Sequence, residues 1–134
     1  MKQQKLHILI AEDDIDDGEI IQESFARHPA FLNVDMVKNG QELLNFLKSS
    51  KDIPDIILTD INMPILNGIE ALAEIHEDSI LRNIPAFVYS TAINPSYEAK
   101  CKELGTKGFL IKPFQLEEFY EIPNRILYML GLKG

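Results

Sequence analysis

Three apolar runs of this chain each end directly in charged side chains. These side chains are Glu12 and Asp13 after residues 6–11, Asp60 after residues 55–59, and Lys112 after residues 108–111. If the runs are neighbouring parallel strands, their carboxyl ends gather the acids and the lysine in one crevice at the edge of a sheet. Clustered carboxylates repel one another unless a cation neutralises them, and oxygen ligands suit Mg²⁺ or Mn²⁺. The pattern therefore predicts a site for a hard cation and a phosphoryl group.

Asp60 has a second chemistry open to it, because a carboxylate can attack a phosphoryl group and form an acyl phosphate. Phosphoryl transfer needs positioning and charge neutralisation more than covalent assistance, and Lys112 could supply part of that charge. Ser90 and Thr91 end a fourth apolar run, where a hydroxyl could donate to a phosphoryl oxygen. A turn or capping role fits that hydroxyl equally well. Glu12 and Asp13, taken without the other residues, would also fit an acid cluster at a helix start, but Asp60 and Lys112 at the other strand ends favour the site.

The elements that must position these residues alternate along the chain. Strands are predicted at residues 6–11, 33–37, 54–60, 84–90 and 107–111. Helices are predicted at 15–27, 41–48, 68–77, 95–104 and from about 115 onward. All strands but the second are nearly continuous in apolar residues, which is typical of strands covered on both faces, whereas the second alternates like an edge strand. Strand–helix alternation with short links predicts βαβ units and a parallel sheet.

We therefore expect an α/β fold, with a five-stranded parallel sheet doubly wound by five helices. With the strand order 2-1-3-4-5, the first and third strands are neighbours where the order reverses, and ligands bind at that point. Glu12 and Asp13 would then lie beside Asp60.

Pro123 breaks a local rule, because it lies on the apolar stripe of the last helical pattern. A proline in a helix interior removes one hydrogen bond and costs ~3 kcal/mol. The helix must either kink there or break and restart. Ile122 would be a poor N-cap for a restart, so we favour a kink.

Length and composition narrow the function classes. A chain of 134 residues suits one domain spanning 1–134, and its net charge of −8 argues against nucleic-acid binding. No apolar stretch approaches the ~20 residues that span a membrane, and no signal peptide is evident, so we expect a cytoplasmic protein without a membrane partner. Cys101 is the single cysteine, which excludes an internal disulfide and a thiolate zinc site.

Taken together, the motifs resemble the receiver domain of two-component response regulators, of the stand-alone chemotaxis-regulator type. The residues that carry the resemblance are 8–14, 60–64 with Gly68, Ser90, and 112–114. They occur in the family's order and spacing over essentially the whole chain, so the set is specific although each motif alone is weak. The resemblance implies a flavodoxin-like fold.

The resemblance also implies a role for each site residue. Asp60 would be the phosphoacceptor, and Lys112 would contact the phosphoryl group. Glu12, Asp13, Asp60 and the backbone carbonyl of Asn62 would hold Mg²⁺ or Mn²⁺.

Two further positions would form the switch. Ser90 would be the switch hydroxyl, and we prefer it to Thr91 because it is the fifth residue after Pro85, where the family often has proline. Phe109 would be the switch aromatic, whose rotamer reports the position of Ser90.

The expected function is that of a stand-alone receiver in a phosphorelay. Asp60 would take its phosphoryl group from a histidine kinase or a histidine phosphotransfer protein and change contacts with an unknown downstream protein, or pass the group onward. The chain would not be an independent enzyme, although it would take part in its own Mg²⁺-dependent phosphotransfer and autodephosphorylation.

Two alternatives come from other classes of protein. A flavodoxin-like electron carrier would bind FMN through a hydroxyl-rich first loop, but the acids at residues 12–14 would repel the FMN phosphate. A phosphatase with an aspartyl nucleophile commonly has a second acid two residues beyond it, where this chain has Asn62.

Overall fold

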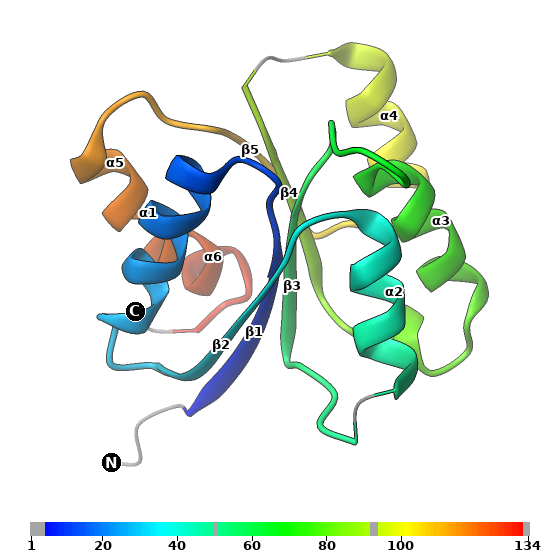
Figure 1. Ribbon diagram of the computed structural model, residues 1–134, viewed down its shortest axis with the longest axis horizontal. Coiled ribbons are helices and arrows are strands. Elements are labelled where there is room, and N and C mark those ends of the chain that lie inside the picture. The colour runs from blue at the N-terminus through cyan, green and yellow to red at the C-terminus, as the bar shows by residue number, and fades with distance from the viewer. Residues whose placement is uncertain (1–4, 50, 92–93, 133–134) are drawn as a thin grey trace.

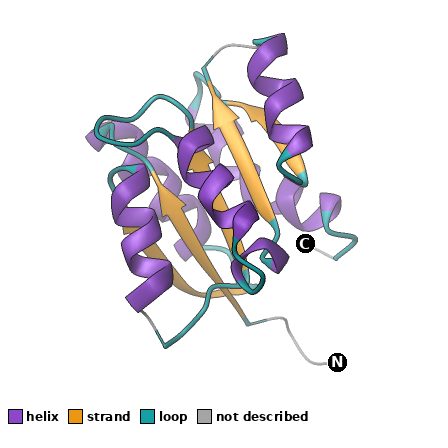
Figure 2. Ribbon diagram, turned by 90° about the vertical axis from the view of Figure 1, so that its right-hand side faces the viewer, coloured by secondary structure: helices purple, strands orange, loops and turns teal. Residues whose placement is uncertain are grey.

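The apolar runs form the strands of one parallel sheet in a computed structural model, which describes residues 5–49, 51–91 and 94–132. The strands are β1 (Leu6–Ala11), β2 (Phe31–Val37), β3 (Ile56–Asp60), β4 (Ala86–Ser90) and β5 (Gly108–Ile111). Their order in the sheet is β2-β1-β3-β4-β5 (Figure 1), which confirms the predicted topology. The arrows drawn in Figure 2 run side by side in one direction, as expected when helices connect every pair of strands.

Helices cover both faces of the sheet. They are α1 (Ile15–Ala26), α2 (Gly40–Ser49), α3 (Gly68–Glu77), α4 (Pro95–Glu103), α5 (Leu116–Tyr120) and α6 (Ile122–Met129), with a short 3₁₀ turn η1 (Leu81–Asn83). Figure 1 shows α1, α5 and α6 on one face, and α2, α3 and α4 on the other. None of the helices in the described part of the chain is both long and apolar enough to cross a membrane.

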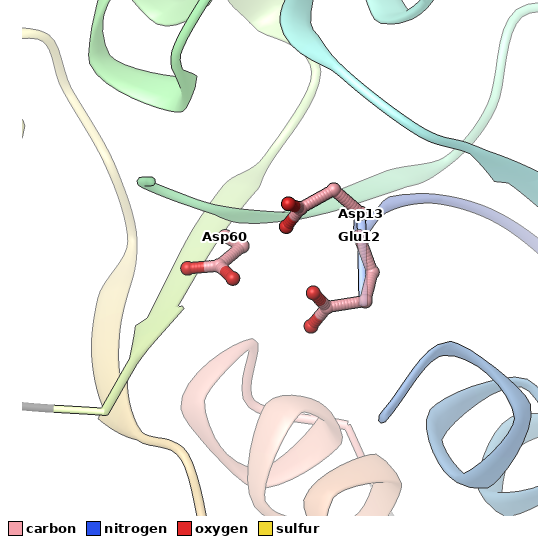
Figure 3. Close-up of side chains that lie close together, drawn as sticks. All are labelled: Glu12, Asp13 and Asp60. Atoms are coloured by element: carbon pink, nitrogen blue, oxygen red, sulfur yellow. The ribbon is translucent and has the colours of Figure 1, made fainter. Parts of the chain in front are cut away.

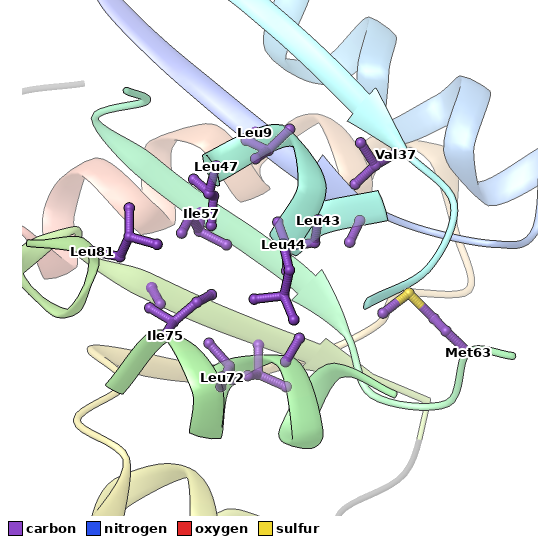
Figure 4. Packing of buried hydrophobic residues seen from close by; sticks show 14 of the residues in the cluster. Leu9, Val37, Leu43, Leu44, Leu47, Ile57, Met63, Leu72, Ile75 and Leu81 are labelled. Carbon is purple, nitrogen blue, oxygen red and sulfur yellow. The ribbon is translucent and has the colours of Figure 1, made fainter. Parts of the chain in front are cut away.

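Two apolar clusters fill the space between the sheet and its helices, because successive side chains of a strand point to opposite faces. The α1-side cluster takes Ile8, Ile10, Leu58, Phe87, Tyr89 and Leu110 from the sheet. The α3-side cluster takes Leu9, Ala11, Ile57 and Val88 from the sheet, and Figure 4 shows it packed against α2 and α3. The central strands are buried on both sides, which explains why their sequences read as continuous apolar runs.

The predicted kink at Pro123 is wrong, because the last helical segment is divided in two. Glu121 separates α5 from α6, so Pro123 lies in the first turn of α6. The missing N–H of a proline has no intrahelical acceptor to lose at that position. No side chain caps the start of α6, but Ile122 is fully buried and His28 Nε2 lies 2.8 Å from Asn124 Oδ1. Tertiary packing thus replaces the N-cap that the sequence lacks.

Ile65 is strained in the loop between β3 and α3. Among the residues that the structure describes, it is the one non-glycine residue with a positive φ, +70°. The Leu66 N–H donates to the Pro64 carbonyl across it, over 2.7 Å. A left-handed conformation costs an L-residue ~1–2 kcal/mol, and the 80% exposed side chain of Ile65 gains little by packing.

Replacing Ile65 with glycine should raise the free energy of unfolding by about 0.5–1 kcal/mol, as measured by urea denaturation, because the relief of strain exceeds the entropy that glycine adds to the unfolded chain. Ile80→Gly is the matched control, because Ile80 is also exposed but has φ −95°. The control should lower stability by roughly 0.5–1 kcal/mol through the entropy of the unfolded chain. A loss of stability in Ile65→Gly would show that the turn is not strained.

Gly68 lets α3 begin directly against the end of β3. A Cβ atom at this position would overlap the backbone oxygen of Asp60, and the Gly68 N–H donates to the Ile61 carbonyl over 2.9 Å. Asn67 and Glu70 form a reciprocal capping box at the same end of the helix. The backbone that carries Asp60 is therefore held in place by the start of α3.

We expect Gly68→Ala to lower the free energy of unfolding by about 1–3 kcal/mol, because the added methyl group forces the backbone apart. Gly18→Ala is the matched control in the interior of α1, where the nearest heavy atom to the added Cβ is 3.8 Å away. That control should raise stability by about 1 kcal/mol through helix propensity. Equal effects in the two variants would contradict the close packing of α3 on β3.

Candidate functional site

Four polar side chains meet at the carboxyl ends of β1, β3, β4 and β5. They are Glu12, Asp60, Tyr89 and Lys112, each no more than 7% exposed. Each follows a member of the α1-side cluster by two residues. Because side chains along a strand alternate between the two faces, all four lie on the same face of the sheet. Register then sets them side by side, since Asp60 pairs directly with Tyr89.

The ammonium of Lys112 lies among three carboxylates. Its Nζ is 2.8 Å from Glu12 Oε1, 3.0 Å from Asp60 Oδ2 and 3.2 Å from Asp17 Oδ2. Burial by itself would lower the pKa of Lys112, but the hydrogen bonds to Glu12 and Asp60 outweigh it and hold that pKa above its usual range. Lys112 is therefore charged, and it offsets part of the buried negative charge.

Asp60 is held by one donor on each oxygen. Oδ1 accepts from the Ile61 N–H over 2.7 Å, and Oδ2 accepts from Lys112. Burial raises the pKa of Asp60 to about 6, despite the opposing effect of Lys112. The charged carboxylate is thus only partly compensated in the resting protein, and it would gain from an added cation.

Glu12, Asp13 and Asp60 form the acidic cluster that the sequence predicted. One carboxylate oxygen from each lies within 4.8 Å of the others, and Figure 3 shows the three groups turned toward a common space. Asp13 is exposed while the other two are buried, which leaves an approach from solvent. A set of carboxylate oxygens fits a hard divalent cation such as Mg²⁺ or Mn²⁺.

The remaining predicted residues lie around this cluster. Asn62 is exposed in the loop after β3. Ser90 is the buried last residue of β4, and its carbonyl accepts from the Lys112 N–H over 2.7 Å. Phe109 pairs with Val88 and packs against the α3-side cluster, on the opposite face of the sheet from Lys112. The structure thus brings Glu12, Asp13, Asp60 and Lys112 into one group, with Ser90 at its border.

Sequence reasoning missed Tyr89 as a member of the site. Its hydroxyl donates to Glu12 Oε1 over 2.5 Å, and its ring centroid lies 5.0 Å from Lys112 Nζ. Burial and the neighbouring Glu12 carboxylate raise its pKa well above 10, so the hydroxyl keeps its proton. The sequence did hold a signal for this role. Tyr89 lies near the end of an otherwise apolar strand, and a buried tyrosine hydroxyl needs a hydrogen-bond partner.

Asp17 was interpreted only as an acid at a helix start. The structure confirms that part, since its N–H donates to the Asp14 side chain over 2.8 Å at the N-terminus of α1. Its carboxylate also reaches Lys112, a contact for which the sequence offers no signal beyond the charge of the two residues.

The sequence of this chain is similar to those of known response regulators. The family model of the response regulator receiver domain matches residues 8–123. Sensory transduction protein LytT of Oceanobacillus iheyensis is 32% identical over 96% of this chain, which spans 51% of that relative's length. Two-component response regulator ORR11 of rice, Oryza sativa subsp. indica, is 31% identical over 90% of this chain and 80% of the relative.

Solved structures show the same likeness in three dimensions. The phosphorylated cyanobacterial phytochrome response regulator RcpA superimposes with a TM-score of 0.85 at 31% identity, covering 92% of this chain and 91% of that one. The Mn²⁺-bound form of response regulator Rcp1 has a TM-score of 0.81 at 26% identity, covering 91% of each chain. With a matching model over most of its length, this chain belongs to the response regulator receiver domain family of two-component systems.

Proposed function

We propose that residues 1–134 act as one receiver domain that accepts a phosphoryl group on Asp60 from a histidine kinase or a histidine phosphotransfer protein. The observation that carries this proposal is the arrangement around Asp60: a buried carboxylate hydrogen-bonded to Lys112, with oxygens of Glu12 and Asp13 within 4.8 Å of its own. The similar regulator RcpA is described as phosphorylated, which supports the same chemistry here.

In the transfer, one Asp60 oxygen forms a bond to phosphorus while the bond between phosphorus and the donor's imidazole nitrogen breaks. The leaving imidazole keeps the electron pair of that bond. The product carries about two negative charges on strong acceptor oxygens. The ammonium of Lys112 already lies 3.0 Å from Asp60, so it is placed to turn toward the phosphoryl oxygens of the product.

We assign the cation site to Glu12, Asp13 and Asp60, with the backbone carbonyl of Asn62 as a further oxygen ligand. Bound there, Mg²⁺ or Mn²⁺ would neutralise charge between the carboxylates and the phosphoryl oxygens. The oxygen donor set of the acidic cluster supports this assignment, as does the Mn²⁺ in the structure of the similar Rcp1.

Ser90 and Phe109 would carry the signal away from the site. Ser90 lies two residues beyond Val88, which pairs with Phe109, so alternation places Ser90 and Phe109 on the same face of the sheet. A shift of the Ser90 hydroxyl toward the phosphoryl group would let Phe109 repack and change contacts with a downstream protein. An FMN-binding electron carrier is not favoured, because Glu12 and Asp13 would repel the FMN phosphate where this fold binds its ligand.

Asp13→Asn should weaken Mg²⁺ binding by at least about tenfold, because it removes one charged oxygen ligand from the cluster. Isothermal titration calorimetry measures the effect. The exposure of Asp13 should keep the fold intact in this variant. Asp16→Asn, an exposed acid in the first turn of α1, is the matched control and should bind Mg²⁺ nearly as the wild-type chain does. Equal affinities in wild type and Asp13→Asn would remove Asp13 from the ligand set.

Acetyl phosphate with Mg²⁺ should add one phosphoryl group to the chain, and Asp60→Asn should abolish the addition, because the amide is a poor nucleophile. Intact-mass spectrometry detects the adduct. Asp35→Asn is the control and should leave labelling unchanged, since the Asp35 carboxylate contacts the ring of His7, at 2.7 Å from Nε2, and is not part of the acidic cluster. Undiminished labelling of Asp60→Asn would falsify the assignment of the acceptor.

A further inference from the structure

The Tyr89 hydroxyl is a second hydrogen-bond donor to Glu12, and it has no role in the proposed phosphoryl transfer. Its Oε1 accepts from Lys112 Nζ at 2.8 Å and from the Tyr89 hydroxyl at 2.5 Å, while Oε2 accepts from the Asp14 N–H at 3.1 Å. The Glu12 side chain is fully buried, so water does not compensate for a lost donor. Two donors therefore share one oxygen of a buried carboxylate, and one of them is the lysine expected to turn away.

We propose that Tyr89 is a positioning residue that frees Lys112 for the phosphoryl group. Its hydroxyl keeps Glu12 hydrogen-bonded and oriented while the ammonium turns from Glu12 to the phosphoryl oxygens on Asp60. This inference rests on the proposed phosphorylation of Asp60, and it adds a residue outside the predicted acid–lysine–serine set.

The physical reason is the cost of leaving a buried charge without a donor. If Lys112 were the only donor to Glu12 Oε1, its departure would leave that oxygen without a hydrogen bond, whether or not the assigned cation is bound to the carboxylate. The lysine would then be held at Glu12, and its transfer to the phosphoryl group would be disfavoured. With Tyr89 in place, Oε1 keeps one short hydrogen bond after Lys112 has gone.

Tyr89 is well placed for this role because it cannot follow the lysine. Its ring is fully buried in the α1-side cluster, and its backbone lies in β4 between β3 and β5. Phenylalanine would fill the same apolar space, so the hydroxyl is the part of the side chain that packing alone does not explain. Tyr89→Phe thus isolates the hydrogen bond to Glu12.

The first test needs no phosphodonor. A double-mutant cycle of Tyr89→Phe and Lys112→Met, measured by urea unfolding without divalent cations, reports whether the two donors substitute for each other at Glu12. We expect the double variant to be destabilised beyond the sum of the single effects, by about tenfold in the unfolding equilibrium constant, because only it leaves Oε1 without a donor. Additive effects would overturn the inference.

The second test uses the single conservative variant, so it stands even if Lys112→Met fails to fold. Intact-mass time courses with acetyl phosphate and saturating Mg²⁺ compare wild type, Tyr89→Phe and Tyr128→Phe, the last being a tyrosine that is 84% exposed. Tyr89→Phe should be labelled about tenfold more slowly than wild type, and Tyr128→Phe at the wild-type rate.

Calorimetry separates this role from a structural one. Mg²⁺ affinity of Tyr89→Phe should stay near that of wild type, because Lys112 still holds Glu12 in the resting protein. Equal labelling rates in Tyr89→Phe and wild type, or a parallel loss of Mg²⁺ affinity and rate, would refute the inference. A wild-type chain that takes no phosphoryl group would instead refute the proposed function, and the unfolding cycle would still decide whether Tyr89 replaces Lys112 at Glu12.

Discussion

The ammonium of Lys112 contacts three carboxylates at once, from Glu12, Asp17 and Asp60, at distances of 2.8–3.2 Å, and offsets part of their negative charge. Without it, the carboxyl ends of β1 and β3 and the start of α1 would repel one another in a buried space. The same cation is the group a phosphoryl anion would attract. The interaction that stabilises the resting site is therefore the one that the proposed function must rearrange, and Tyr89 makes that rearrangement less costly at Glu12.

The sheet separates the acidic cluster and Lys112 from Phe109, the residue proposed to carry the signal away. Glu12, Asp60 and Lys112 lie on the face covered by α1, α5 and α6, whereas Phe109 packs on the face covered by α2, α3 and α4. Ser90 ends a central strand, and its carbonyl is bonded to the backbone of Lys112. Because successive side chains of a strand point to opposite faces, the same strand ends place the acidic cluster on one face of the sheet and the proposed switch residues on the other.

Local sequence patterns predicted most of the fold for physical reasons. Buried parallel strands must be apolar on both faces, so their positions could be predicted with boundaries at most two residues from those in the structure. The error at Pro123 has the opposite cause. The lack of a good N-cap residue near Pro123 favoured one kinked helix over a break. In the structure, burial of Ile122 and its neighbours stabilises a second helix start that no capping side chain marks.

By itself the sequence determined that Glu12, Asp13, Asp60 and Lys112 gather at one edge of the sheet. Each follows the carboxyl end of a strand, and in a parallel sheet all carboxyl ends lie at the same edge. Only the tertiary structure decided which atoms meet there. Tyr89 and Glu12 are 77 positions apart in the chain, and their contact depends on the register of β1, β3 and β4 and on the face each side chain takes. Those quantities arise from packing the whole sheet against its helices, and no local pattern encodes them.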